Sequence, residues 1–95
     1  MVLDAVPFVH DIIKKTITRN DIVIDATCGN GNDTLFLSKL SKHVFAFDIQ
    51  ENAINTTKEL LKSNSIDNYT LIQDSHSNID KHVNKKITLA MFNLG

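Results

Sequence analysis

Four short apolar runs, separated by longer amphipathic stretches, constrain this chain more than any other feature of its sequence. The runs predict β-strands over residues 22–24, 44–47, 69–72 and 87–92. The stretches before and between them predict helices over residues 7–18, 33–40, 51–63 and 76–83. Strands that alternate with helices form βαβ units with right-handed crossovers and a parallel sheet. We therefore predict an α/β fold whose nearly continuous apolar strands are buried on both faces.

The periodicity of the predicted helices indicates which of their faces pack on the sheet. Pro7 fits the first turn of the first helix, where its missing N–H breaks no hydrogen bond. The residues expected to face the sheet recur three or four positions apart. They are Phe8, Val9, Ile12, Ile13 and Ile17 in the first helix, Leu37 and Leu40 in the second, and Ala53, Ile54, Thr57, Leu60 and Leu61 in the third.

Length and composition exclude several classes of protein. The 95 residues, of which 42% are hydrophobic, suffice for one small domain or part of a larger one. A net charge of −1 gives no overall attraction to nucleic acid, so RNA binding would need a local basic patch. One cysteine excludes an intramolecular disulfide and fits a reducing cytoplasm. Because we find no signal peptide and no apolar run near the ~20 residues that span a bilayer, we expect a cytoplasmic protein without membrane contact.

The segments that follow the predicted strands form the candidate site. Ligands of open parallel sheets bind outside the carboxyl ends of the strands. Residues 27–34, 48–50 and 73–76 follow the first three strands, and Asn93 follows the fourth. We therefore expect these four segments to meet at one edge of the sheet.

The first of these segments contains a glycine loop, Gly29-Asn30-Gly31, directly before a predicted helix. No lysine follows the glycines as in a phosphate-binding P-loop, and the third glycine of the GxGxxG fingerprint is missing. Asp33 would compete with a pyrophosphate for the N–H groups at the helix start and would repel it. A ligand with a cationic end suits the loop better. S-adenosylmethionine (SAM), which has a sulfonium, an ammonium and no phosphate, is such a ligand.

Asp48 ends the second predicted strand, seventeen residues after Gly31. An acid near that distance can accept hydrogen bonds from both ribose hydroxyls of a nucleotide-like ligand. Together, the loop and this acid favour an adenosine-containing ligand. Two alternatives stay open, since Asp33 could be only a helix N-cap and Asp48 could be only the last residue of a strand. A nicotinamide-binding oxidoreductase is the rival enzyme class.

Several segments resemble the rRNA methylase family: “DATCGNGNDTLFL”, “FAFDIQ”, Ser75-His76 and the terminal “MFNLG”. Better-understood members of that family resemble bacterial tRNA methyltransferases that N-methylate the 5-aminomethyl group of wobble (2-thio)uridine. The resemblance implies a Rossmann-like class I methyltransferase fold, SAM as cofactor and tRNA as partner. By the same analogy, the four predicted strands would lie in the order 3-2-1-4. Thr27 departs from the generic class I pattern, which has glycine at that position.

The resemblance covers the N-terminal half of such proteins, which continue with “YLPGGDK” where this chain ends. We therefore expect residues 1–95 to be a partial SAM-binding domain. A non-catalytic remnant with part of a cofactor pocket is a second alternative. The fourth strand, at residues 87–92, would then be an open apolar edge, which predicts an unstable or self-associating product.

The resemblance also assigns roles to individual residues. Asn30, Asn32 and Asp33 would surround the methionine end of the cofactor. Asp48 would bind the ribose hydroxyls, and Gln50 would lie beside the ribose or the adenine. Ser75 and His76 would flank the adenine, with Asp74 as a further candidate. Asn93 would orient the target amine by analogy with amino-methyltransferases, and no residue is identified as a general base.

The remaining reactive residues have simpler interpretations. Cys28 lies in the loop but has no histidine fixed beside it, and direct methyl transfer needs no thiol. The histidines show neither an i, i+4 pair nor a cysteine partner, so no metal site is predicted. They are His10, His43, His76 and His82. Two basic clusters are either solvated faces or contacts to tRNA phosphates. They comprise Lys14, Lys15 and Arg19, and Lys81, Lys85 and Lys86.

Overall fold

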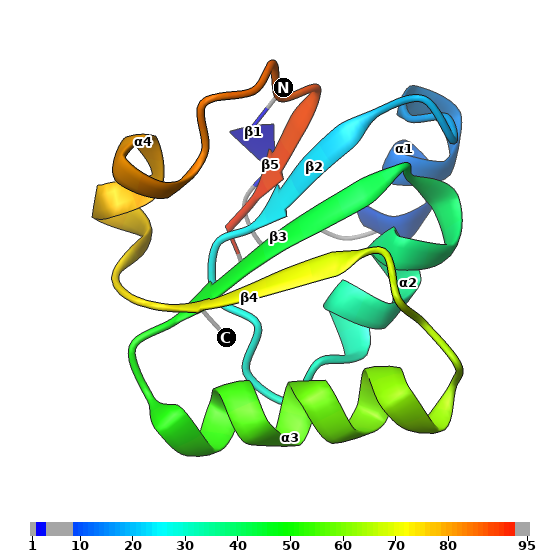
Figure 1. Cartoon of the computed structure of the whole chain (residues 1–95). Helices are drawn as coiled ribbons and strands as arrows, with labels where there is room; N and C mark the ends of the chain where they lie inside the picture. Colours follow the sequence, from blue (N-terminus) through cyan, green and yellow to red (C-terminus); the bar gives the residue numbers. More distant parts are fainter. Residues whose placement is uncertain (1, 4–8, 93–95) are drawn as a thin grey trace.

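The computed structural model describes residues 2–3 and 9–92 and contains the predicted parallel sheet (Figure 1). Within those residues the sheet has five strands in the order β1-β5-β2-β3-β4. The strands are β1 (Val2–Leu3), β2 (Ile22–Asp25), β3 (His43–Asp48), β4 (Tyr69–Gln73) and β5 (Leu89–Met91). All four pairs of neighbours are parallel. The predicted strands correspond to β2, β3, β4 and β5, so the predicted order 3-2-1-4 is confirmed.

β5 is shorter than predicted and lies inside the sheet, between β1 and β2, instead of at its edge. It is shorter than residues 87–92, and its outer side pairs with β1 through Val2 opposite Ala90 and Leu3 opposite Met91. The expectation of an open edge is therefore wrong at these positions. A paired strand does not present its N–H and C=O groups to another chain, so the predicted self-association loses its basis there.

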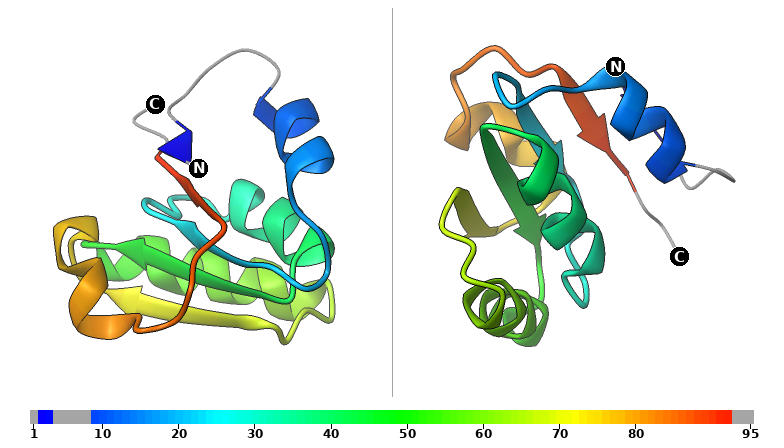
Figure 2. Two further views of the ribbon diagram at one scale, coloured as in Figure 1. Left: turned by 90° about the horizontal axis from the view of Figure 1, so that it is seen from above. Right: turned by 90° about the vertical axis from the view of Figure 1, so that its right-hand side faces the viewer.

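The described helices lie close to their predicted positions. They are α1 (Val9–Thr16), α2 (Asn32–Leu40), α3 (Glu51–Ser63), a 3-10 turn (His76–Asn78) and α4 (Ile79–His82). Pro7 and Phe8 lie outside the described residues, and the predicted helix 76–83 is divided between the 3-10 turn and α4. The first three helices cover one face of the sheet and α4 lies on the other (Figures 1 and 2). In the part of the chain that the structure describes, no helix is long and apolar enough to cross a membrane.

One hydrophobic cluster lies on each face of the sheet. Under α1, α2 and α3, the fully buried Ile13 and Leu37 pack with Val44 and other strand residues. On the α4 face, Phe47 packs with Ile24 and other residues. Ile12 is a correction to the predicted helix face, because 36% of its surface is exposed. It lies one residue, or about 100°, around the helix from the buried Ile13 and so misses the sheet.

Candidate active site

The glycine loop turns sharply between β2 and α2. Gly31 caps α2 with φ +89°, in the left-handed region that side chains disfavour. A Cβ atom at Gly31 would lie 3.0 Å from the backbone Cα of Thr57 in α3. The Thr57 hydroxyl also donates a hydrogen bond to the carbonyl of Gly29 at 3.2 Å. The loop therefore adopts its shape because Gly31 lets it lie directly against α3.

Asp48 joins this loop to the end of β3. One carboxylate oxygen accepts the backbone N–H of Gly29 at 3.1 Å, and the other accepts the N–H of Gln50 at 3.0 Å. The side chain is buried, with 8% of the residue exposed. A carboxylate has about four acceptor positions, so these two bonds leave capacity for a ligand hydroxyl. Asp48 thus fixes the two strand ends while it remains able to accept further hydrogen bonds.

Asp25, the last residue of β2, holds both ends of the glycine loop through hydrogen bonds to Thr27 and Thr34. Its fully buried carboxyl accepts the Thr34 hydroxyl at 2.6 Å and the Thr27 N–H at 3.3 Å. The pKa of Asp25 is raised to about 7, mainly by burial and also by the charges of Asp33 and Asp48, against the lowering effect of those bonds. Two acids in the same loop region thus differ in role, since Asp25 is sealed inside while Asp48 lies at the wall of a pocket.

A pocket of about 220 Å³ opens where β2, β3 and β4 end. Its lining includes the predicted residues Asp48, Ser75 and His76. Asp74, the further candidate for the adenine, lines it as well. Thr27 and Ile49 also line it and lie in the predicted segments without a predicted role, whereas Ala26 lies outside those segments. Ile49 could have been found from the sequence, because an apolar residue between Asp48 and Gln50 follows the strand rather than belonging to it. It is 67% exposed, which makes it a free apolar surface at the rim.

Four predicted cofactor residues lie outside this pocket lining. They are Asn30, Asn32, Asp33 and Gln50. The Asn30 side chain accepts the N–H of Asn32 at 3.1 Å, which closes a local turn at the start of α2. The pocket is smaller than the ~300–1,000 Å³ usual for small-molecule sites. It therefore suits one end of an adenosine-containing ligand, whose other end would extend beyond it.

The Asp33 carboxylate does not act as a simple helix cap. α2 has no side-chain cap, and Asp33 instead accepts a bond from His10 Nε2 in α1 at 3.0 Å. The His10 ring stacks on Phe36 with 3.8 Å between ring centroids. Asp33 thus links α1 to the start of α2, in addition to any role toward a ligand.

Asp74, at the end of β4, organises the segment that carries Ser75 and His76. One carboxylate oxygen accepts the Ser75 N–H at 2.7 Å and the Asn78 amide at 2.9 Å. The other lies 2.8 Å from His82 Nε2 in α4. The bond to His82, followed by those to Asn78 and Ser75, lowers the pKa of Asp74 to about 2. Asp74 is therefore ionised at neutral pH and holds this segment in place.

Ser75 and His76 lie beside each other at the pocket with different surroundings. The Ser75 hydroxyl accepts the Ser77 N–H at 3.2 Å and so caps the 3-10 turn. His76 is exposed, and its ring makes a T-shaped contact with the ring of Phe92 at 5.2 Å between centroids. Asn93, the predicted amine-positioning residue, lies outside the described residues.

The cysteine has the inert character that the sequence suggested. Cys28 is buried, and burial raises the pKa of its thiol to about 11. A thiol that stays protonated is a poor nucleophile at neutral pH. Over residues 2–3 and 9–92, no group of three or more histidine, cysteine or acidic side chains is arranged to hold a metal ion.

The chain is similar in sequence to known methyltransferases. The family described as “Putative rRNA methylase” matches residues 44–95. The chain is 37% identical over 105 residues to the chloroplastic tRNA (mnm(5)s(2)U34)-methyltransferase of Arabidopsis thaliana, across 96% of this chain and 38% of that protein. It is 40% identical over 73 residues to a “Probable cobalt-precorrin-6B C(15)-methyltransferase” of Methanobrevibacter smithii, across 76% of this chain and 39% of that protein.

The fold is also similar to that of solved methyltransferases. A Streptococcus mutans structure, described as “a putative methyltransferase” in complex with SAH, superposes with a TM-score of 0.88 at 51% identity. The superposition covers 90% of this chain and 49% of that one, so this chain spans about half of its length. The family match covers more than half of the chain, and the sheet order is that of the methyltransferase fold. The chain therefore belongs to the rRNA methylase family and has the Rossmann-like fold of class I methyltransferases.

Proposed function

We propose that the chain binds SAM at the carboxyl edge of its sheet, and that the protein N-methylates the 5-aminomethyl group of wobble (2-thio)uridine in tRNA. The observation that carries the cofactor proposal is the Asp48 bridge, a buried carboxylate with spare acceptor capacity at a pocket rimmed by the exposed Ile49. The S. mutans neighbour, crystallised with SAH, supports it. The A. thaliana relative, named for the mnm(5)s(2)U34 nucleoside and aligned with 96% of the chain, supports the substrate.

The residues present fit an adenosine ligand with a cationic tail. Ile49 offers an apolar surface to a base, and Asp48 would accept hydrogen bonds from the ribose hydroxyls. Ser75 and His76 would border the base on the other side of the pocket. The methionine end would lie toward Asn30, Asn32 and Asp33, where a carboxylate favours an ammonium group. Gln50, exposed beside Asp48, would contact the ribose or the base.

When bound, SAM supplies an electrophilic methyl group on its sulfonium. The contribution of the protein is position, since direct transfer requires the amine nitrogen, the methyl carbon and the sulfur to lie in line. The amine must be neutral, because its lone pair forms the new bond. Asn93 would accept a hydrogen bond from this amine through its side-chain carbonyl.

Substitution of Asp48 by asparagine is expected to weaken SAM binding at least about tenfold, because it removes a charged hydrogen-bond acceptor. The asparagine amide would also place a donor against the N–H of Gly29 or Gln50. Isothermal titration calorimetry with SAM measures the change. Asp80→Asn is the matched control, since Asp80 is exposed on α4 and does not line the pocket. Equal affinities of Asp48→Asn and wild type would refute the assigned role of Asp48.

The proposed reaction is tested with tRNA that lacks the final wobble methyl. Transfer of a labelled methyl group from SAM to the wobble nucleoside is the expected result. SAM binding without transfer by this chain would favour the non-catalytic remnant. Binding of NAD without binding of SAM would favour the oxidoreductase alternative and would overturn the proposal.

A further inference from the structure

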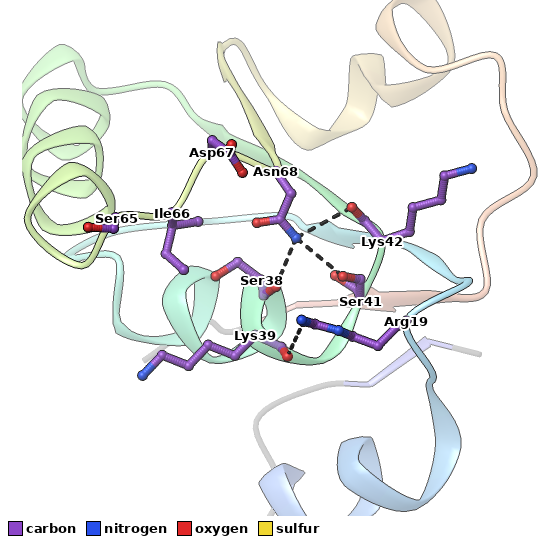
Figure 3. Close-up of a pocket in the computed structure, with 9 residues that line it drawn as sticks. All are labelled: Arg19, Ser38, Lys39, Ser41, Lys42, Ser65, Ile66, Asp67 and Asn68. Carbon is purple, nitrogen blue, oxygen red and sulfur yellow. Dashed lines mark hydrogen bonds between the residues drawn. The ribbon is translucent and has the colours of Figure 1, made fainter.

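A second and larger hollow, of about 540 Å³, lies at the end of the sheet opposite the glycine loop (Figure 3). Its walls come from segments far apart in the sequence. Arg19 precedes β2, and Lys39 lies in the last turn of α2. Lys42 lies between α2 and β3, and Asn68 precedes β4. None of these residues belongs to the proposed cofactor site.

Positive charge dominates this hollow. Arg19, Lys39 and Lys42 line it together with one acid, Asp67, and all four are exposed. In Figure 3 the side chains of Lys39 and Lys42 extend on opposite sides of the hollow. The chain as a whole has a net charge of −1, so this excess of cations is local.

Three backbone carbonyls of the hollow accept hydrogen bonds from side chains. Arg19 Nη1 donates a hydrogen bond to the Lys39 carbonyl at 2.8 Å. The Asn68 amide donates to the carbonyls of Ser38 at 2.8 Å and Ser41 at 3.2 Å (Figure 3). These carbonyls lie at the carboxyl end of α2, where the helix dipole would otherwise repel an anion. Arginine has five N–H donors, and the bond to Lys39 uses one of them.

The positive surface continues past Lys42. An adjoining hollow of about 470 Å³ shares Lys42 and adds His43 and Lys85. Burial and the charge of Lys85 lower the pKa of His43, which agrees with a positive potential there. The fold thus brings Arg19 and Lys85, from the two basic clusters of the sequence, to the same end of the sheet. We call this surface, comprising Arg19, Lys39, Lys42 and Lys85, the amino-end groove.

We propose that the amino-end groove binds the phosphodiester backbone of RNA. The inference rests on the proposed function because it takes RNA as the substrate. It goes further by naming the surface of this chain that contacts the RNA backbone. β3 runs from His43 at the groove to Asp48 at the cofactor pocket, which separates the two residues by about 17 Å. The groove would therefore contact phosphates away from the target nucleotide and position the RNA without reading its sequence.

The double variant Lys39→Glu/Lys42→Glu tests the groove. A fluorescein-labelled RNA hairpin with uridine in its loop is titrated with the chain, and anisotropy is followed at several salt concentrations between about 50 and 200 mM. We expect the affinity to fall at least tenfold and the salt slope, log K against log salt, to become shallower by about two. The matched control is Lys58→Glu/Lys62→Glu, which makes the same charge change at exposed lysines that line neither hollow and belong to neither basic cluster. Its affinity is expected to change less than twofold.

Three results would overturn the inference. The first is an equal loss of RNA affinity in the two double variants, and the second is no RNA binding by the wild type. The third is binding of inorganic phosphate by the wild type together with an unchanged RNA affinity of the groove variant. Calorimetry with SAM and a thermal melt on the same samples keep the proposals separate. If the wild type and both variants are folded and bind SAM, any of these results refutes only the proposal that the groove binds RNA. If the wild type is folded but binds no SAM, the proposed function fails independently of the groove.

Discussion

The variant Gly31→Ala is expected to unfold at a markedly lower temperature than the wild type and to lose measurable SAM binding. Alanine at φ +89° costs about 1–3 kcal/mol in backbone strain. Its Cβ would lie 3.0 Å from Thr57 Cα, so backbone must move, and overpacking of this kind costs about 1–3 kcal/mol more. A loss of about 3 kcal/mol lowers the melting temperature of a domain of this size by roughly 12–24 °C. Thermal unfolding followed by circular dichroism measures the shift.

Gly29→Ala is the matched control for this prediction. Gly29 also has a positive φ, +53°, but a Cβ atom there would meet nothing within 4 Å. Gly29→Ala is therefore expected to lower the free energy of unfolding only by the backbone strain of a positive φ, about 1–2 kcal/mol. The difference between the two variants isolates the contact of the loop with α3. If both variants lose the same stability, the close approach to Thr57 does not determine the loop conformation.

The sequence could identify the loop but could not rank its glycines. The apolar run before it, the amphipathic stretch after it and Asp48 at the next strand end are local patterns, and the parallel sheet order is confirmed. The special requirement at Gly31 depends on Thr57, which is 26 residues away and approaches only when α3 packs beside the loop. Local patterns carry no such distance information.

Other features of the site were hidden for the same reason. Asp74 is a candidate adenine partner by sequence and lines the pocket, but its carboxylate also holds Ser75, Asn78 and His82. The bond to His82 crosses from a strand end to a helix, which no local motif specifies. The pairing of β1 with β5 is also non-local, since Val2 meets Ala90 across most of the chain. Local chemistry therefore predicted the elements and strand ends, while the packing between elements decided which side chains remain available to a ligand.

Substitution of Asp25 by asparagine is expected to remove a pH dependence from the stability of the protein. Burial raises the pKa of Asp25 from its ordinary value of 3.8 to about 7 in the folded state, so the folded protein holds this proton more tightly than the unfolded chain. The stabilisation is fully present below about pH 4 and is lost as pH rises toward and through 7. A shift of this size corresponds to a loss on the order of 4 kcal/mol. Urea unfolding at a series of pH values measures it.

The asparagine variant mimics the protonated acid because its amide can serve both partners of Asp25. Its carbonyl can accept the Thr27 N–H, and its NH₂ can donate to the Thr34 hydroxyl, which accepts as well as donates. Compared with the wild type, Asp25→Asn should therefore gain stability as pH rises from about 4 to about 8. Titration of His43, whose lowered pKa acts in the opposite direction, is common to both proteins and cancels in the difference. Asp25→Ala, which leaves both partners unbonded, should lose stability at low pH instead. A wild-type curve parallel to that of Asp25→Asn would show that Asp25 does not carry a proton at neutral pH in the folded protein.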